Sequence, residues 1–246
     1  MIETIRNAWK IPELRKKILF TVFALLIFRL GSVVPVPFID SNMLGATLNN
    51  MGGIFTLLGA MNGTAFSMAA VFALGVQPYI NSSIIIQLLT VAIPALERLQ
   101  KEGGEEGRKK IAAITRYVTV AIGLLQGFGY YTLIRTQGGG TMLDTAGLPG
   151  WWAGIVIVLC FTAGSAFVMW LGEQITEFGI GNGISIILFV SIVARFPNSI
   201  IRQINNVANG DLAWGVLVLM YLGALLLIVM IVLVNDAERR LPVQYS

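Results

Sequence analysis

Apolar runs alternate with short polar stretches along this chain, and the length of the runs predicts its fold. The strongest runs cover residues 18–34, 71–93, 111–133, 151–171, 184–196 and 213–234. One helix needs about 20 predominantly apolar residues to cross the hydrocarbon core of a bilayer. The pattern therefore predicts an all-α protein, a polytopic membrane helix bundle with about six transmembrane helices.

The first and fifth runs depart from the simple pattern at their ends. The first run meets Pro35 and Pro37 without the small-residue cleavage site of a signal peptide, so we expect a retained span. The fifth run is short for a bilayer. Its helix is expected to reach back into the glycine-rich turn at residues 179–183 or forward past Pro197.

The stretch between the first and second runs, residues 38–70, is too apolar for a solvated loop. Glycines interrupt it, and its apolar piece of about a dozen residues is too short to span a bilayer. A re-entrant helix over residues 52–66 fits this pattern, and a loop packed over the outer face of the bundle fits it nearly as well. The side chains concerned include Gly52, Gly53, Ile54, Phe55, Leu58, Gly59, Met61 and Gly63.

The composition agrees with a membrane location and narrows the chemistry. Of the 246 residues, 56% are hydrophobic and 12% are charged, which leaves too little charge to cover the surface of a soluble globule. The chain has no histidine and a single cysteine, Cys160. Histidine-based triads, histidine-based metal sites and disulfide frameworks are therefore excluded. We expect no enzyme activity, no metal and no cofactor.

The basic residues predict the orientation of the chain. Five Lys or Arg residues precede the first run, six lie within residues 98–116 and two follow the sixth run, whereas three lie in the alternate segments. The positive-inside rule then places the amino terminus in the cytosol. The expected parts are a cytosolic amphipathic lead-in at 1–17, spans one to five within 18–196, a cytosolic loop at 97–110, an external loop at 197–212, the sixth span at 213–234 and the start of a cytosolic loop at 235–246.

Two runs carry polar and aliphatic residues in helical register. The stripes consist of Val76, Ile80, Ser83 and Gln87 on the second run and of Ile184, Leu188, Ser191 and Arg195 on the fifth. Offsets of four, seven and eleven residues return to nearly one direction on a helix. The polar residues indicate helices that face a cavity or a partner, and ordinary packing between helices is the alternative.

The loop at residues 97–110 is densely charged with both signs. Solvation alone explains most such runs, and a docking site for a cytosolic partner is the sharper interpretation. The glycine run at 179–183 has no buried strand before it and no Gly-Lys-Ser/Thr after it, so we exclude a nucleotide site there.

Four segments together resemble the SecY family, the central subunits of the bacterial Sec translocon. They are FRLGSVVPVP at 28–37, FALGVQPYINSSIIIQLLT at 72–90, KEGGEEGRKKI at 101–111 and WLGEQITEFGIGNGIS at 170–185. The resemblance implies a ten-span channel of the bacterial plasma membrane, built as two inverted halves around an hourglass pore that opens sideways to lipid. This chain would supply the first inverted half and the sixth span, as a fragment or as one piece of a split chain.

The resemblance also implies a function. Such a channel passes unfolded secretory polypeptides across the membrane and membrane-protein segments laterally into it, driven by a docked SecA ATPase or ribosome. The implied partners are SecE and SecG subunits, the carboxy-terminal half of the channel, signal-sequence-bearing polypeptides and membrane lipid, with no direct nucleic-acid site.

The functional sites of the family map onto the two stripes, the glycine-broken stretch and the charged loop. The pore ring falls on Val76, Ile80, Ile184 and Leu188, the lateral gate on Asn81, Ser83 and Gln87, and the plug on residues 52–66. Docking of a motor or ribosome falls on Lys101, Arg108, Lys109, Lys110, Arg239 and Arg240. Val76 is smaller than the isoleucine that is common at its ring position.

The predicted spans lack the residues that two alternative classes of membrane protein would need. Half of an inverted-repeat secondary transporter would carry charged coupling residues near mid-membrane, and no Asp or Glu lies well inside a predicted span. An intramembrane hydrolase would need histidine or paired carboxylates, which the predicted spans lack.

Overall fold

The computed structural model describes residues 11–41, 43–44, 64–101, 103–137, 143–144, 147, 149–210 and 213–237. Within these residues every regular element is a helix, and β contacts are limited to isolated bridges between Pro35 and Ala70 and between Ile39 and Leu143. The predicted all-α fold is confirmed for this part of the chain. The chain divides into two compact units, one up to Arg195 and one from Phe196 onward.

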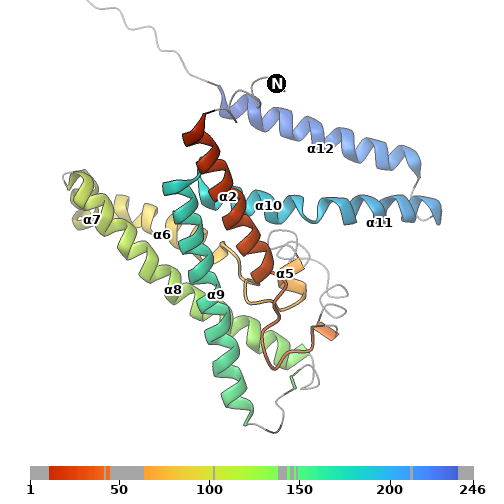
Figure 1. Cartoon of the computed structure of the whole chain (residues 1–246), viewed down its shortest axis with the longest axis horizontal. Coiled ribbons are helices and arrows are strands. Elements are labelled where there is room, and N and C mark those ends of the chain that lie inside the picture. The colour runs from red at the N-terminus through yellow and green to blue at the C-terminus, as the bar shows by residue number, and fades with distance from the viewer. Residues whose placement is uncertain are drawn as a thin grey trace, which may run out of the picture. The chain divides into compact units, whose positions relative to one another are not determined.

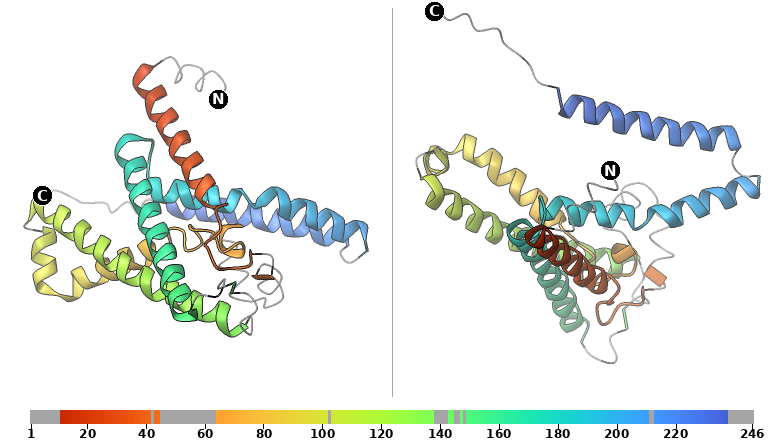
Figure 2. Two further views of the ribbon diagram at one scale, coloured as in Figure 1. Left: turned by 60° about the horizontal axis from the view of Figure 1, so that its bottom comes forward. Right: turned by 45° about the horizontal axis from the view of Figure 1, so that its top comes forward.

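The first unit is built around two long helices that contact each other closely. Its helices are α2 (Pro12–Gly31), α5 (Thr64–Ser67), α6 (Gln77–Ala92), α7 (Pro94–Lys101), α8 (Gly104–Gln137), α9 (Gly150–Phe178) and α10 (Gly183–Val193) (Figure 1). α8 packs against α6, α7 and α9, and α9 also packs against α2 and α10 (Figure 2). The second unit holds α11 (Phe196–Ala208) and α12 (Trp214–Asn235).

The described helices make this a multi-pass membrane protein. Four helical stretches are long and apolar enough to cross a membrane: Gly104–Thr136, Gly150–Phe178, Gly183–Ala208 and Trp214–Asn235. α6 and α7, which are bent by 100° at their junction, add a fifth if the pair is one span. α2 is not among them. Its 20 residues include the charged side chains Glu13, Arg15, Lys16, Lys17 and Arg29.

The described part of the amino-terminal lead-in is continuous with the first span. We predicted a separate lead-in over residues 1–17, but α2 begins at Pro12 and runs unbroken to Gly31. Proline suits the first turn of a helix, because its missing N–H would have no partner there. No glycine or proline follows until residue 31, so nothing separates the lead-in from the span. Residues 1–10 lie outside the described residues.

The second span is shorter than predicted, and two prolines explain both of its ends. We expected a helix from residue 71, but residues 71–76 form turns and α6 begins at Gln77. Pro78 cannot sit deeper in a helix because its ring clashes with the preceding turn, and Gly75 before it has a positive φ of 53°. At the other end Ile93 is extended, as the residue before Pro94 must be.

The fifth span extends forward and not backward. The side chain of Asn182 accepts a hydrogen bond from the Ser185 N–H at 3.2 Å and so fixes the start of α10 at Gly183. Beyond α10 the predicted external loop at 197–212 is helical over Phe196–Ala208, with Pro197 in the first turn. The external position of residues 197–212 stays a prediction, since α11 lies within the stretch Gly183–Ala208 that is long enough to cross a membrane.

Two clusters of buried side chains hold the first unit together. One joins α8 to α9 through Ile134 and Phe161, each 0% exposed. The other joins α2, α9 and α10 through Phe28, Ile175 and Ile187. Between helices in a membrane such clusters are stabilised by close van der Waals packing. The second cluster also contains Val76 and contacts Ile184, so it sets the spacing of the helices that carry the predicted ring.

Close backbone contacts in this unit require glycine. A Cβ built on Gly183 would lie 2.1 Å from the Gly172 carbonyl oxygen, and one on Gly164 would lie 2.0 Å from the Val71 carbonyl oxygen. The nearest atoms are backbone atoms, which cannot turn aside as a side chain can. α10 and the turn before α6 therefore lie directly against α9.

α12 in the second unit leaves nearly all of its large apolar side chains exposed. Leu217 is the buried residue of this helix, and only 6% of its most apolar 18-residue stretch is buried. An exposed apolar surface of this size is typical of a helix that faces lipid or another subunit.

Candidate functional site

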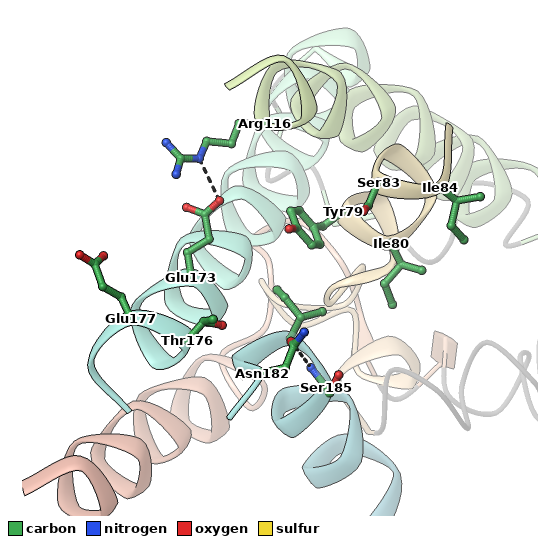
Figure 3. A pocket seen from close by; sticks show the side chains of 11 residues that line it. Tyr79, Ile80, Ser83, Ile84, Arg116, Glu173, Thr176, Glu177, Asn182 and Ser185 are labelled. Carbon is green, nitrogen blue, oxygen red and sulfur yellow. Dashed lines mark hydrogen bonds and ion pairs between the residues drawn. The ribbon is translucent and has the colours of Figure 1, made fainter. Parts of the chain in front are cut away.

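A cleft of about 480 Å³ opens among α6, α8, α9 and α10 (Figure 3). Its lining residues are Tyr79, Ile80, Ser83, Ile84, Arg116, Glu173, Thr176, Glu177, Asn182, Ile184 and Ser185. Ile80 comes from the stripe on the second span and Ile184 from the stripe on the fifth. The two predicted stripes therefore meet in one cleft.

All four residues of the predicted ring belong to one apolar cluster. Ile80, Ile184 and Leu188 are partly buried against it, and Val76 is 3% exposed within it. Val76 is the N-cap of α6, and the Ile80 N–H donates to its carbonyl oxygen at 3.0 Å. The i,i+4 relation expected from the spacing is therefore present, although Val76 and Leu188 do not line the cleft.

The Ile184 side chain occupies space that is free because residue 172 of α9 is a glycine. A Cβ on Gly172 would lie 2.3 Å from the Ile184 Cδ1 atom. Because Gly172 has no side chain, the Ile184 side chain can lie against α9. α9 thus sets the position of the ring residue on α10.

The rim of the cleft is polar and includes an ion pair between α8 and α9. The Arg116 Nε atom donates to the Glu173 Oε1 atom at 2.8 Å, and the side chains are 53% and 24% exposed (Figure 3). On the same helix as Glu173, the Thr176 hydroxyl oxygen accepts a hydrogen bond from the Gly183 N–H at 2.9 Å. The cleft therefore combines aliphatic side chains with a charged rim.

Sequence reasoning missed this rim. We ended the fourth span at residue 171, whereas α9 continues to Phe178 and carries Glu173 and Thr176 on one face. The spacing of Glu173, Thr176 and Glu177 at three and four residues was the available signal. Arg116 is 57 positions away from its partner, and no local pattern connects the two.

The predicted lateral-gate residues lie on two sides of α6. Ser83 lines the cleft, Asn81 is half-buried and Gln87 is exposed. Ser82 beside them is fully buried and shares a hydrogen bond with Thr119 of α8 at 2.5 Å. Part of the polar character of this span therefore joins α6 to α8 by a hydrogen bond.

The described part of the charged loop is mostly helical, and two of its acids are paired with bases. Lys101 contacts Glu97 at 2.7 Å and Lys110 contacts Glu106 at 3.0 Å, each across one helical turn. Lys101 donates this hydrogen bond to the Glu97 carboxylate, which raises the pKa of Lys101 above its ordinary value.

The other predicted docking residues are exposed or fall outside the described residues. Arg108 and Lys109 are exposed on the first turns of α8. Arg108 and Lys101 line a cleft of about 540 Å³ at the junction of α7 and α8. Arg239 and Arg240 lie outside the described residues.

The predicted plug also lies largely outside the described residues. Gly52, Gly53, Ile54, Phe55, Leu58, Gly59, Met61 and Gly63 all fall in the undescribed stretch 45–63. The structure resumes at α5, where Phe66 is 5% exposed. The Tyr130 hydroxyl of α8 donates to the Phe66 carbonyl oxygen, and the two rings stack at 4.8 Å. The chain is thus anchored to α8 where the predicted plug ends.

Long apolar helices packed around a cleft with aliphatic and charged walls define a multi-pass helical membrane protein. The chain matches the SecY family over residues 70–246. It is 41% identical over 258 residues to the protein translocase subunit SecY of Streptomyces coelicolor, covering 100% of this chain and 57% of that relative. It is 42% identical over 248 residues to the subunit of the same name from Aquifex aeolicus, with the same coverage. The chain belongs to the SecY family.

A comparison with solved structures agrees on the fold. Sec61 in the canine ribosome–channel complex from the endoplasmic reticulum matches with a TM-score of 0.53 at 16% sequence identity, over 97% of this chain and 54% of that chain. At this identity the likeness concerns the fold alone. The chain spans about 57% of the length of the curated relatives it matches.

Proposed function

We propose that this chain is the amino-terminal part of a protein-conducting channel in a bacterial plasma membrane, with its amino terminus in the cytosol. The channel passes unfolded secretory polypeptides across the membrane and releases membrane-protein segments sideways into lipid. One observation carries the proposal: Ile80 and Ile184, from two different spans, meet in one cleft. Membership of the SecY family supports it.

The aliphatic ring explains how such a channel rests closed. Val76, Ile80, Ile184 and Leu188 share one cluster and offer no polar atom to replace the hydration shell of an ion. An ion at such a constriction loses hydration without gaining ligands, and a narrow apolar collar disfavours a continuous column of water. The same collar holds a passing polypeptide without preferring any sequence.

The lateral gate in this half of the channel is formed by α6 and α8. The hydrogen bond between Ser82 and Thr119 fastens these helices to each other. The two helices therefore move together when the gate opens toward lipid. Asn81 and Gln87 offer polar contacts along α6 to a signal sequence that enters there.

Membership of the SecY family supports the proposed partners, and the exposed charges support one docking surface. SecA or a ribosome docks on the cytosolic loop at residues 97–110, where Arg108 and Lys109 are exposed. The carboxy-terminal half of the channel completes the pore, and SecE and SecG join the assembly. Residues 52–66 form the plug that fills the outer side of the resting pore.

Ring variants test this function. Ile80→Ser together with Ile184→Ser should raise the resting ion conductance of the complete channel. Serine hydroxyls hydrogen-bond to water, so the constriction no longer disfavours a water column. The readout is single-channel current in planar bilayers.

The matched control is Ile85→Ser, on the same helix but outside the cleft and 43% exposed. The control should leave the conductance unchanged. If the double variant leaks no more than Ile85→Ser, the ring assignment is wrong and these positions are ordinary helix packing.

A further inference from the structure

A second cavity, of about 410 Å³, lies between α8 and α9 and is distinct from the cleft that carries the ring. Its walls include Leu124 and Phe128 of α8 and Ile155 and Leu159 of α9, and one end is lined by Arg135 and Trp151. The four wall residues are between 41% and 62% exposed. The groove is therefore apolar along its length and carries a permanent positive charge at one end.

The length of the groove matches one leaflet of a bilayer. Leu124 and Arg135 are eleven residues apart on a continuous helix, which corresponds to about 16 Å at a rise of 1.5 Å per residue. Half of a typical hydrocarbon core of ~30 Å is about 15 Å. Arg135 and Trp151 thus lie at the depth of the headgroups when Leu124 lies near the bilayer centre. Tryptophan and arginine are typical residues of that interface.

Two glycines of these helices, Gly127 and Gly154, are already used in packing α8 against α9. A Cβ on Gly154 would lie 2.7 Å from the Tyr131 Cζ atom, and one on Gly127 would lie 3.4 Å from the Val158 carbonyl oxygen. A third transmembrane helix seeks small residues that let it approach closely. The mouth of this groove presents Phe128 and Leu159 instead, so it suits a flexible chain better than a helix.

We propose that this groove binds one phospholipid, with an acyl chain along α8 and α9 and its phosphate on Arg135. The guanidinium group is suited to the phosphate because it donates two parallel hydrogen bonds. The acyl chain fills the apolar length between Phe128 and Leu159. The positive-inside prediction assigns the site to the outer leaflet. The proposal rests on the membrane location of α8 and α9 and not on polypeptide transport.

Photolabelling tests the site on the complete channel in nanodiscs. The probe is a phosphatidylglycerol with a photoreactive group midway along one acyl chain, and labelled peptides are mapped by mass spectrometry. Labels should concentrate on the stretches 124–128 and 155–159. Arg135→Gln, which removes the phosphate ligand, should lower this labelling about tenfold, the scale of one charge-assisted contact. Ile155→Trp, which fills the groove, should also lower it.

The controls make equivalent changes at exposed positions of the second unit. Leu222→Trp replaces a side chain of α12 that is 60% exposed, and Arg202→Gln removes an exposed cation of α11. Both control variants should be labelled like the unaltered channel. The resting conductance should be unchanged in all four variants. A photoreactive diacylglycerol without phosphate should label the groove weakly and be insensitive to Arg135→Gln.

Two results would overturn the proposal. Equal labelling in all variants would mean that the groove meets only bulk lipid. Labelling that appears only after an accessory subunit, SecE or SecG, has been removed from the complex would mean that a protein helix occupies the groove. Thermal unfolding of each variant distinguishes lost binding from lost folding.

Discussion

The close approach of α10 to α9 can be tested without touching a ring residue. Gly183 opens α10, and a Cβ at this position would lie 2.1 Å from the Gly172 carbonyl oxygen and 2.7 Å from the Ile175 Cβ atom. Gly183→Ala therefore requires the two helices to separate, because neither neighbouring atom can rotate away.

The size of the shift follows from these distances. Moving the new methyl group from 2.1 Å to an ordinary contact of about 3.2 Å displaces the start of α10 by roughly 1 Å. Overpacking of this kind costs about 1–3 kcal/mol of stability. Ile184 is the next residue, so the ring shifts with the helix and its seal loosens. We expect a lower melting temperature and a higher resting conductance.

The control for Gly183→Ala is Gly129→Ala on α8, where a Cβ would meet nothing within 4 Å. Alanine there should be neutral or stabilising by about 0.5–1 kcal/mol, because it limits the freedom of the unfolded chain. The measurements are thermal unfolding in detergent and single-channel current in planar bilayers. If Gly183→Ala matched Gly129→Ala in both, the close contact would not position the ring.

Three further predictions concern the rim, the charged loop and the plug. Arg116→Glu should destabilise the channel by about 1 kcal/mol or less, since the ion pair is partly exposed, and adding Glu173→Arg should recover most of the loss in thermal unfolding. Arg108→Glu with Lys109→Glu should weaken SecA binding to channels in nanodiscs, with a larger loss at low than at moderate salt; unchanged affinity at both would exclude docking on this loop. A cysteine at Gly59 in a Cys160→Ala background should be shielded from an external thiol reagent at rest and labelled during transport, whereas equal labelling in both states would favour a loop packed on the outer face.

The ring could be predicted from the sequence because its signal is local. Val76 with Ile80 and Ile184 with Leu188 are each one helical turn apart, and family resemblance selected these turns among many aliphatic ones. The structure brings the two pairs into one cluster. Their function as a constriction stays a prediction.

Other features could not be predicted, because they depend on single residues or on distant partners. The hydropathy pattern extended the second span back to residue 71, whereas Pro78 sets the helix start at Gln77. The pair of Arg116 and Glu173 joins positions 57 residues apart, a separation at which sequence spacing carries no information. The charge content of the loop at 97–110 suggested solvated chain, and its i,i+4 pairs instead support helices.

The shortness of α6 has an electrical consequence. Its 16 residues rise about 24 Å, less than a typical hydrocarbon core of ~30 Å, and the adjoining cleft of about 480 Å³ has room for roughly sixteen waters at ~30 Å³ each. In the proposed channel, water in this cleft would conduct and the membrane potential would fall mainly across the aliphatic layer beside it. A charge on a polypeptide that passes through the proposed channel would then cross most of the voltage, worth about 2.3 kcal/mol per 100 mV, over a short distance at Ile80 and Ile184. Transport driven by the membrane potential should therefore depend most on those charges of the polypeptide that lie at the aliphatic layer.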